Sequence, residues 1–211
     1  MTRFGRCFGG LWAKAACMAA MTLSWQGIAH SDRDNGESLS KQLVNVLVQP
    51  PLPPAAVAQA HIAGCDENRI SGAMYLVERK SDEGVKTVDV LMFIAGLSDG
   101  KHAVHIHETG VCEPCSAAQG HFDPGPKSNS SPDGNHPYHA GDLVNVDVNN
   151  GIGILRTITT RITLTDGSLS VFDKDGSAVI VHAGMDTYCP DGEVAGCAGG
   201  ARAACGIIMP F

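Results

Sequence analysis

Stretches in which apolar and polar residues alternate follow one another along the chain from about residue 55 to its end. Alternation with a period of two is typical of a β-strand that buries one face, and Gly, Asp and Asn separate the stretches as turn residues do. The pattern predicts eight strands, at Ala55–Ile62, Ile70–Glu78, Thr87–Leu97, Ala103–Glu108, Leu143–Val148, Ile152–Thr165, Ala178–His182 and Cys205–Met209.

Two stretches, Thr109–Gly141 and Ala183–Ala204, are too long and too polar to be strands, and they contain several of the cysteines and histidines. Long loops inside a compact domain usually carry function. Eight short strands with two long loops predict an all-β fold, an antiparallel barrel or sandwich.

The start of the chain has a different character. Residues 1–29 have a basic start, an apolar stretch and small residues at Gly27 and Ala29, which is typical of a secretory signal peptide. A membrane anchor is disfavoured because Lys14 and Gln26 interrupt a span that needs about 20 apolar residues. Residues 30–54 are polar and end in a proline-rich stretch, so we expect a linker there and a domain over 55–211.

Composition narrows the function classes. The net charge is −7, and without the three basic residues of the leader it is −10, so the basic footprint of a nucleic-acid-binding protein is absent. Eight cysteines and nine histidines in 211 residues point to metal or disulfide chemistry. An exported chain would meet an oxidising compartment, where disulfides persist.

The clearest local signal is the pair His105 and His107 in an apolar strand. Side chains two residues apart share a face of a strand, so both imidazoles point the same way while Val104 and Ile106 face the core. A strand presents two nitrogen ligands to one metal in this way. A zinc hydrolase is disfavoured, because no further ligand follows at the spacing such enzymes use.

Five motifs in order extend this signal. They are GLSDGKHAVHIHETGVC at 96–112, QGHFDP at 119–124, HAGDLVNV at 139–146, VIVHAGMD at 179–186 and GGARAACGII at 199–208. Together they resemble the copper/zinc superoxide dismutase family in its exported bacterial form. The resemblance covers about residues 55–211 and implies an eight-stranded antiparallel Greek-key β-barrel.

The resemblance also implies roles for individual residues. His105, His107, His121 and His182 match copper ligands, with His121 bridging to zinc. His139 and Asp142 match zinc ligands, and Asp186 matches the carboxylate that orients metal-bound histidines. Arg202 matches the arginine that positions the anionic substrate, so Arg202 and His121 are the expected catalytic residues.

One departure concerns zinc. The family has a further zinc-binding histidine about eight residues after the bridging one, and that place falls on Asn129, a poor zinc ligand. His136, three residues before His139, is either a substitute ligand or a solvated loop histidine. Copper is therefore the firm expectation as a cofactor, and zinc depends on how this loop folds.

The six cysteines after the leader allow 15 pairings. The family joins a cysteine in the loop after HIHE to the one in ACG, which is Cys205. Both Cys112 and Cys115 fit, and we expect Cys115 to be the partner. Cys189 and Cys197 bracket seven residues of the second long loop and could staple it.

The resemblance implies an exported superoxide dismutase, periplasmic or extracellular, that acts on the superoxide anion by copper redox cycling. The alternative is a copper-binding or copper-delivery protein on the same fold, since fold does not guarantee activity. We expect no nucleic-acid partner and no membrane-spanning segment after the leader. The oligomeric state is left open, with a homodimer as one possibility. The second long loop has Arg202 as its single basic residue, so we expect weak electrostatic steering of the substrate.

Overall fold

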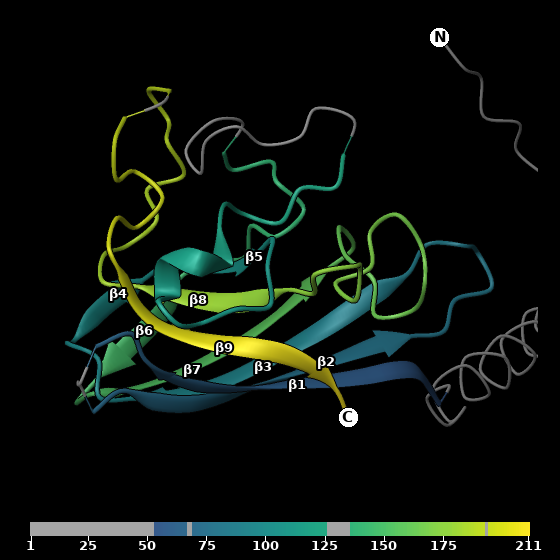
Figure 1. The fold of residues 1–211 in the computed structure, drawn as a ribbon, viewed down its shortest axis with the longest axis horizontal. Coiled ribbons are helices and arrows are strands. Elements are labelled where there is room, and N and C mark those ends of the chain that lie inside the picture. Colours follow the sequence, from purple (N-terminus) through teal and green to yellow (C-terminus); the bar gives the residue numbers. More distant parts are fainter. Residues whose placement is uncertain (1–52, 67–68, 126–135, 193) are drawn as a thin grey trace, which may run out of the picture. The chain divides into compact units, whose positions relative to one another are not determined.

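In a computed structural model, residues 53–66, 69–125, 136–192 and 194–211 are described, and nine antiparallel strands run through them (Figure 1). The strands are β1 (Pro54–Gly64), β2 (Ser71–Arg79), β3 (Thr87–Ala95), β4 (Gly100–His102), β5 (Val104–His107), β6 (Val146–Asn149), β7 (Ile152–Thr159), β8 (Ala178–His182) and β9 (Arg202–Pro210). One 3₁₀ helix, η1 (Cys115–Ala118), lies in the first long loop. The predicted signal peptide and nearly all of the predicted linker fall outside the described residues.

The strands hydrogen-bond in the order β4-β6-β7-β3-β2-β1-β9-β8-β5. The first and last strands of this order are neighbours in the chain, because only Ala103 separates β4 from β5. The sheet therefore curls into a nearly closed antiparallel barrel, which confirms the predicted fold class. The predicted count of eight strands was wrong by one, because the stretch Gly100–His107 changes its pairing partner from β6 to β8 at Ala103.

Alternation along the strands builds the core. In β2 and β3 every second side chain is buried, including Met74, Leu76, Val90 and Met92. β5 and β8 are buried on both faces. The described parts of both long loops lie on the β5 and β8 side of the barrel in Figure 1. A strand covered on both faces can present polar side chains to a dry site between sheet and loop.

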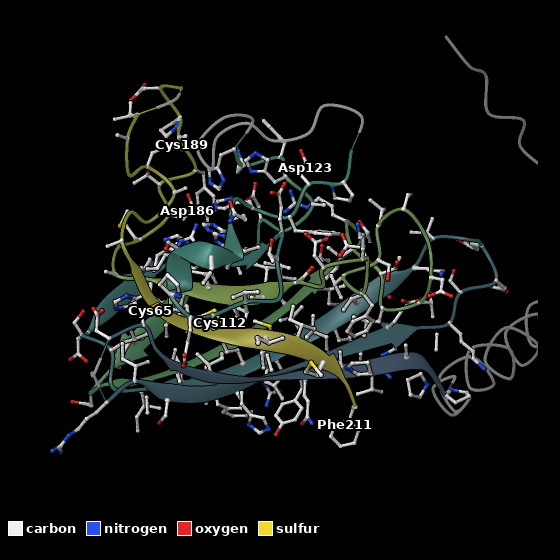
Figure 2. The ribbon with its side chains drawn as sticks, in the orientation of Figure 1. Cys65, Cys112, Asp123, Asp186, Cys189 and Phe211 are labelled. Atoms are coloured by element: carbon white, nitrogen blue, oxygen red, sulfur yellow. A yellow bond between two sulfur atoms is a disulfide. The ribbon has the colours of Figure 1, made fainter. Side chains whose placement is uncertain are left out.

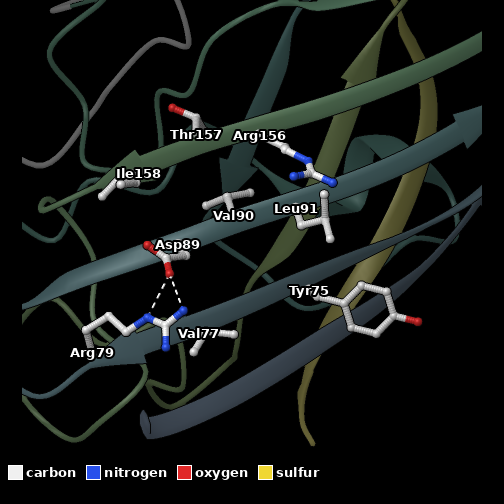
Figure 3. A pocket seen from close by; sticks show the side chains of 9 residues that line it. All are labelled: Tyr75, Val77, Arg79, Asp89, Val90, Leu91, Arg156, Thr157 and Ile158. Carbon is white, nitrogen blue, oxygen red and sulfur yellow. Dashed lines mark hydrogen bonds and ion pairs between the residues drawn. The ribbon is translucent and has the colours of Figure 1, made fainter. Parts of the chain in front are cut away.

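The outer face of β2, β3 and β7 carries a shallow groove of about 550 Å³, which Figure 3 shows from close by. Tyr75, Leu91 and Arg156 line it, and an Arg79–Asp89 ion pair closes one side at 2.6 Å. None of the buried histidines lines this groove.

No helix among the described residues is both long and apolar enough to cross a membrane.

Candidate metal centre

β5 positions the first two histidines as the alternation predicts. His105 and His107 are fully buried and face the loops, and Val104 and Ile106 pack in the core. Single β-bridges then bring the first long loop against this strand, His121 opposite His107 and Asp142 opposite His105. His182 ends the neighbouring strand β8.

The histidines form one cluster. The ring centroids of His105 and His121 lie 4.1 Å apart, and those of His105 and His182 lie 5.0 Å apart. One ring nitrogen from each of four residues lies within 4.8 Å of the others: His105, His107, His121 and His182. These are the four residues that the sequence predicts as copper ligands.

Hydrogen bonds decide which nitrogen of each ring faces the cluster. His107 Nδ1 donates to the carbonyl of Gln119 at 2.8 Å, and His182 Nδ1 donates to the carbonyl of Gly200 at 2.9 Å. His105 Nε2 donates to Asp186 at 3.0 Å. Because these donors carry the ring protons, His105 Nδ1 and His182 Nε2 are both unprotonated. Their lone pairs face each other at a distance of 3.2 Å between the two nitrogens.

Other inward nitrogens are also without a partner. His107 Nε2 and His121 Nε2 are buried and make no hydrogen bond. Buried polar atoms are normally satisfied, and facing lone pairs repel unless a cation lies between them. Imidazole nitrogens are ligands for copper in both of its oxidation states. The cluster therefore fits a copper ion.

A second cluster shares residues with the first. Its members have ligand atoms within 4.8 Å of one another: His105, His121, His136 and Asp142. His136 is buried, with Nδ1 3.1 Å from an Asp142 oxygen but in no hydrogen-bond geometry. His139 is buried as well, with its Nδ1 3.1 Å from the same carboxylate. A carboxylate surrounded by imidazoles is a donor set that zinc takes.

Asp186 connects the two clusters. One oxygen accepts from His105 Nε2 at 3.0 Å, and the other accepts from His136 Nε2 at 2.8 Å and from the Tyr188 amide at 2.7 Å. The Asn145 side chain holds the Asp186 backbone through two hydrogen bonds, of 2.8 and 3.0 Å. Figure 2 labels Asp186 among the ring nitrogens above the sheet.

Burial and hydrogen bonding set the charges of the site. Burial lowers the pKa of His121 to about 4 and that of His182 to about 3, so both rings are neutral at pH 7. Burial alone raises the pKa of Asp142, but three imidazoles that lie 2.7 to 3.1 Å from its carboxylate, those of His121, His136 and His139, outweigh it and hold that pKa far below the ordinary range. Neutral imidazoles and an ionised carboxylate are the forms that bind metals.

His136 behaves differently from the other rings. Burial by itself lowers its pKa, but the carboxylates of Asp142 and Asp186 outweigh that effect and raise the pKa to about 9. The space between these two carboxylates therefore favours a positive charge.

Arg202 lies beside the first cluster because of strand register. It is the first residue of β9 and pairs with His182 of β8, just past a register shift at Val181. Its guanidinium donates to the carbonyls of Cys115 and Gln119, in and directly after η1. Directly opposed residues on antiparallel strands lie within side-chain reach, so Arg202 sits next to a cluster histidine.

The disulfides correct one expectation. Cys205 is bonded to Cys112, so the pairing expected with Cys115 is wrong. Cys115 instead bonds Cys65, which follows β1 and whose amide donates to Ala203. The cause is the pairing of β1 with β9, in which Ala63 lies opposite Cys205. This pairing brings Cys65, remote in the sequence, close to the cysteines of the first long loop. Cys189 and Cys197 are joined as anticipated.

Three positions around the site had no predicted role. Arg161 donates to the carbonyls of Pro137 and Asp142 and so holds the loop that carries the second cluster. His102 is buried, with its ring nitrogens 2.8 Å from the His182 carbonyl and 2.9 Å from that of Ser98. Asn145, described above, is the third. Nothing in the local sequence distinguishes these side chains, because most of their partners are remote in the chain.

Fold and site together define a metalloprotein: a nearly closed β-barrel with two adjoining histidine clusters and an arginine beside one of them. The family model for copper/zinc superoxide dismutase matches residues 70–208. The chain belongs to the copper/zinc superoxide dismutase family.

Individual relatives agree with this assignment. The chain is 32% identical to copper-zinc superoxide dismutase 5 of Dictyostelium discoideum over 138 residues, 63% of this chain and 88% of the relative. It is 34% identical to copper-zinc superoxide dismutase 2 of Aquifex aeolicus over 149 residues, 67% of this chain and 81% of the relative. It is also 37% identical to copper-zinc superoxide dismutase 1 of the same organism over 112 residues, 50% of this chain and 63% of the relative.

Proposed function

We propose that this protein is a superoxide dismutase that converts two superoxide anions and two protons into one oxygen molecule and one hydrogen peroxide molecule. The observation that carries the proposal is the four-histidine cluster, whose inward nitrogens are buried without hydrogen-bond donors, next to a guanidinium. A copper ion held there supplies one-electron chemistry by alternating between two oxidation states.

The protein's own residues do the remaining work. Arg202 provides a permanent positive charge beside the cluster, which suits a small oxyanion. His105, His107 and His182 each keep one nitrogen hydrogen-bonded, which fixes the tautomer and the ring orientation. His121 lies between the clusters with Nδ1 2.7 Å from Asp142 and is the residue we assign to hold and release a proton.

We propose that His121, His136, His139 and Asp142 bind zinc, with His136 in the role that Asn129 cannot fill. Three observations support this role of His136: the side chain is buried, its Nδ1 makes no hydrogen bond, and its Nε2 is hydrogen-bonded to Asp186. The second nitrogen of a metal-bound histidine is usually held by a carboxylate in this way.

Superoxide decay after a radiolysis pulse tests the function directly, on protein loaded with one copper equivalent. We expect catalytic decay close to the diffusion limit. The control is His182→Ala, which should show no catalysis although its circular-dichroism spectrum matches that of the unaltered protein. Decay no faster than that control, before and after zinc addition, would overturn the dismutase and leave a copper-delivery protein.

We also propose that the protein is exported. Three disulfides among the described residues support this, since such bonds persist in oxidising compartments. Both tryptophans, Trp12 and Trp25, lie in the predicted leader. Protein recovered from the periplasm or medium should therefore lack tryptophan fluorescence, and a tryptophan emission band there would contradict removal of residues 1–29.

A further inference from the structure

The Cys65–Cys115 disulfide ends at a residue that also contacts the arginine of the site. Cys115 opens η1, and its sulfur is bonded to Cys65 just beyond β1. The carbonyl of the same Cys115 accepts a hydrogen bond from Arg202 Nη1. One residue is thus covalently tied to the barrel and bonded to the guanidinium. Figure 2 shows Cys65 beside Cys112 at the edge of β9.

The other end of η1 makes the second contact. The carbonyl of Gln119 accepts from Arg202 Nη2 and also from His107 Nδ1, which is 2.8 Å away. Gln119 adopts φ 62° and ψ −147°, a region that residues other than glycine rarely enter. Such a conformation persists only where the surroundings fix it, so the end of η1 at Gln119 must be held by its contacts.

The contacts close into a ring. The Cys65 amide donates to the carbonyl of Ala203 at 2.9 Å, and Ala203 follows Arg202 in β9. Starting at Cys65, the path runs through the disulfide to Cys115, through its carbonyl to Arg202, and along β9 back to Cys65. The arginine backbone and the carbonyl that holds its side chain are therefore anchored to the same point of the barrel.

Packing holds η1 on one side only, where Cys115 and Ala118 lie in a buried cluster with residues of β8 and β9. A cavity of about 280 Å³ lies beside Cys65, Pro114 and Cys115. The other disulfide of this loop, Cys112–Cys205, holds the chain before η1 and contributes neither of the two carbonyls. Without the Cys65–Cys115 bond, the start of η1 borders open space into which it can shift.

We propose that the Cys65–Cys115 disulfide is a positioning element for anion binding: it fixes η1 so that the carbonyls of Cys115 and Gln119 aim the Arg202 guanidinium at the site. The proposal rests on the proposed function insofar as Arg202 binds the anionic substrate.

Azide, a small anion, provides the probe on copper-loaded protein, with affinity read from the azide-to-copper absorption band. Four proteins form a double-mutant cycle: the unaltered chain, Cys65→Ser/Cys115→Ser, Arg202→Ala, and the variant carrying all three changes. We expect Arg202→Ala to weaken azide binding about tenfold and the disulfide variant to weaken it about three- to tenfold. In the Arg202→Ala background, removing the disulfide should change azide affinity less than twofold.

The cycle separates two failures. If Arg202→Ala leaves azide affinity unchanged, the proposed role of Arg202 falls. If Arg202→Ala weakens binding but the disulfide variant does not, or the effects of the two add, the positioning role alone is overturned. Cys189→Ser/Cys197→Ser is the matched control, because it removes a disulfide whose two cysteines both lie in the second long loop and are bonded to neither end of η1, and its azide affinity should stay within twofold.

Hydrogen exchange on metal-free protein gives a second readout. The Gln119 amide donates to Ser116 within η1 at 3.2 Å, so its exchange reports whether η1 is held. We expect at least tenfold faster exchange in Cys65→Ser/Cys115→Ser, and in Cys65→Ala/Cys115→Ala should the serine variant not fold. Unchanged exchange would overturn the proposal.

Discussion

Four buried imidazoles of the two clusters have one nitrogen fixed by an acceptor outside the ligand set and one left for the site: His105, His107, His136 and His182. This division is set by acceptors such as Gln119, Gly200 and Asp186, of which the first two use only their backbone carbonyls. A side chain whose proton position is fixed cannot turn its lone pair away. The hydrogen bonds, and not the residue type alone, therefore determine which nitrogen of each histidine points into the site.

His136 provides the sharpest test at the scale of a residue. We expect His136→Ala to weaken zinc binding by at least tenfold, because it removes one ligand nitrogen and leaves Asp186 with one partner fewer. Zinc content measured by plasma mass spectrometry after dialysis against a chelator checks this. His61→Ala, at an exposed position on β1, is the control and should retain zinc. Equal zinc retention in both variants would assign His136 a structural role only.

Glu78 is a buried carboxylate that belongs to neither cluster. It accepts from the amides of Leu164 and Thr165 at 2.6 and 2.8 Å and from the Thr165 hydroxyl at 2.7 Å. We expect Glu78→Ala to lower the free energy of unfolding by about 2–4 kcal/mol, since a buried and a half-buried amide lose their acceptor. Glu83→Ala, at an exposed position, should change it by less than about 0.5 kcal/mol in the same thermal unfolding series.

The same residue gives a pH dependence. Burial raises the pKa of Glu78, but hydrogen bonds from Thr165 and Leu164 and the charge of Lys86 outweigh it, so the pKa lies below the ordinary 4.5. A depressed carboxyl pKa stabilises the fold above 4.5, and this contribution is lost as the pH falls through the folded-state pKa. The stability difference from Glu78→Gln should shrink between pH 7 and about pH 3.5. A difference that grows on acidification would contradict this account.

At the scale of elements, the site depends on how closely β8 approaches the second long loop. Gly199 has φ +96°, and a Cβ there would lie 2.5 Å from the Ala103 Cβ and 2.8 Å from the His182 Cβ. Any side chain at this position has to push the end of β8 outward, and His182 with it. The glycine is required by the close approach as well as by its backbone angle.

Gly192 offers a matched comparison, because it has φ +91° but open space around it. We expect Gly192→Ala to cost about 1 kcal/mol for its backbone conformation, and Gly199→Ala to cost about 1–3 kcal/mol more. Gly199→Ala alone should also weaken copper binding, measured by competition with a chelator. Equal losses of stability and unchanged copper affinity in both would show that the backbone angle is the sole constraint.

At the scale of the whole molecule, charge works against the proposed substrate. The chain has 22 acidic and 15 basic residues. Next to Gln119, a cavity is lined by Glu108, Asp123, Asp173 and Asp175, and burial together with the negative charges of Asp123 and Asp175 raises the pKa of Glu108. A negative potential beside Arg202 opposes the local attraction of its guanidinium.

We therefore expect weak electrostatic steering. Raising the ionic strength from about 0.01 to 0.15 M shortens the screening length from about 30 to 8 Å, and should change the bimolecular rate of superoxide decay less than twofold. Pulse radiolysis in buffers of increasing salt measures this rate. A steep fall with salt would show a positive funnel that the sequence does not reveal, and a rise would show net repulsion.

Much of the fold follows from the sequence because alternation is local. Side-chain direction in a strand changes with every residue, so the apolar pattern located the strands, and it placed His105 and His107 on one face with no knowledge of partners. The motifs supplied the remaining members of the first cluster, and the structure brings all of them together.

Tertiary structure decided what depends on contacts between distant segments. Strand pairing divides Gly100–His107 between two partners, the end of β1 brings Cys65 to Cys115, and Asp142 and Asp186 draw His136 out of solvent. None of these contacts can be recognised from the local sequence, because the residues around a cysteine or a loop histidine do not indicate which distant residue it will contact in the fold. The sequence by itself determined which residues can bind metal, and the folded chain decided which of them meet.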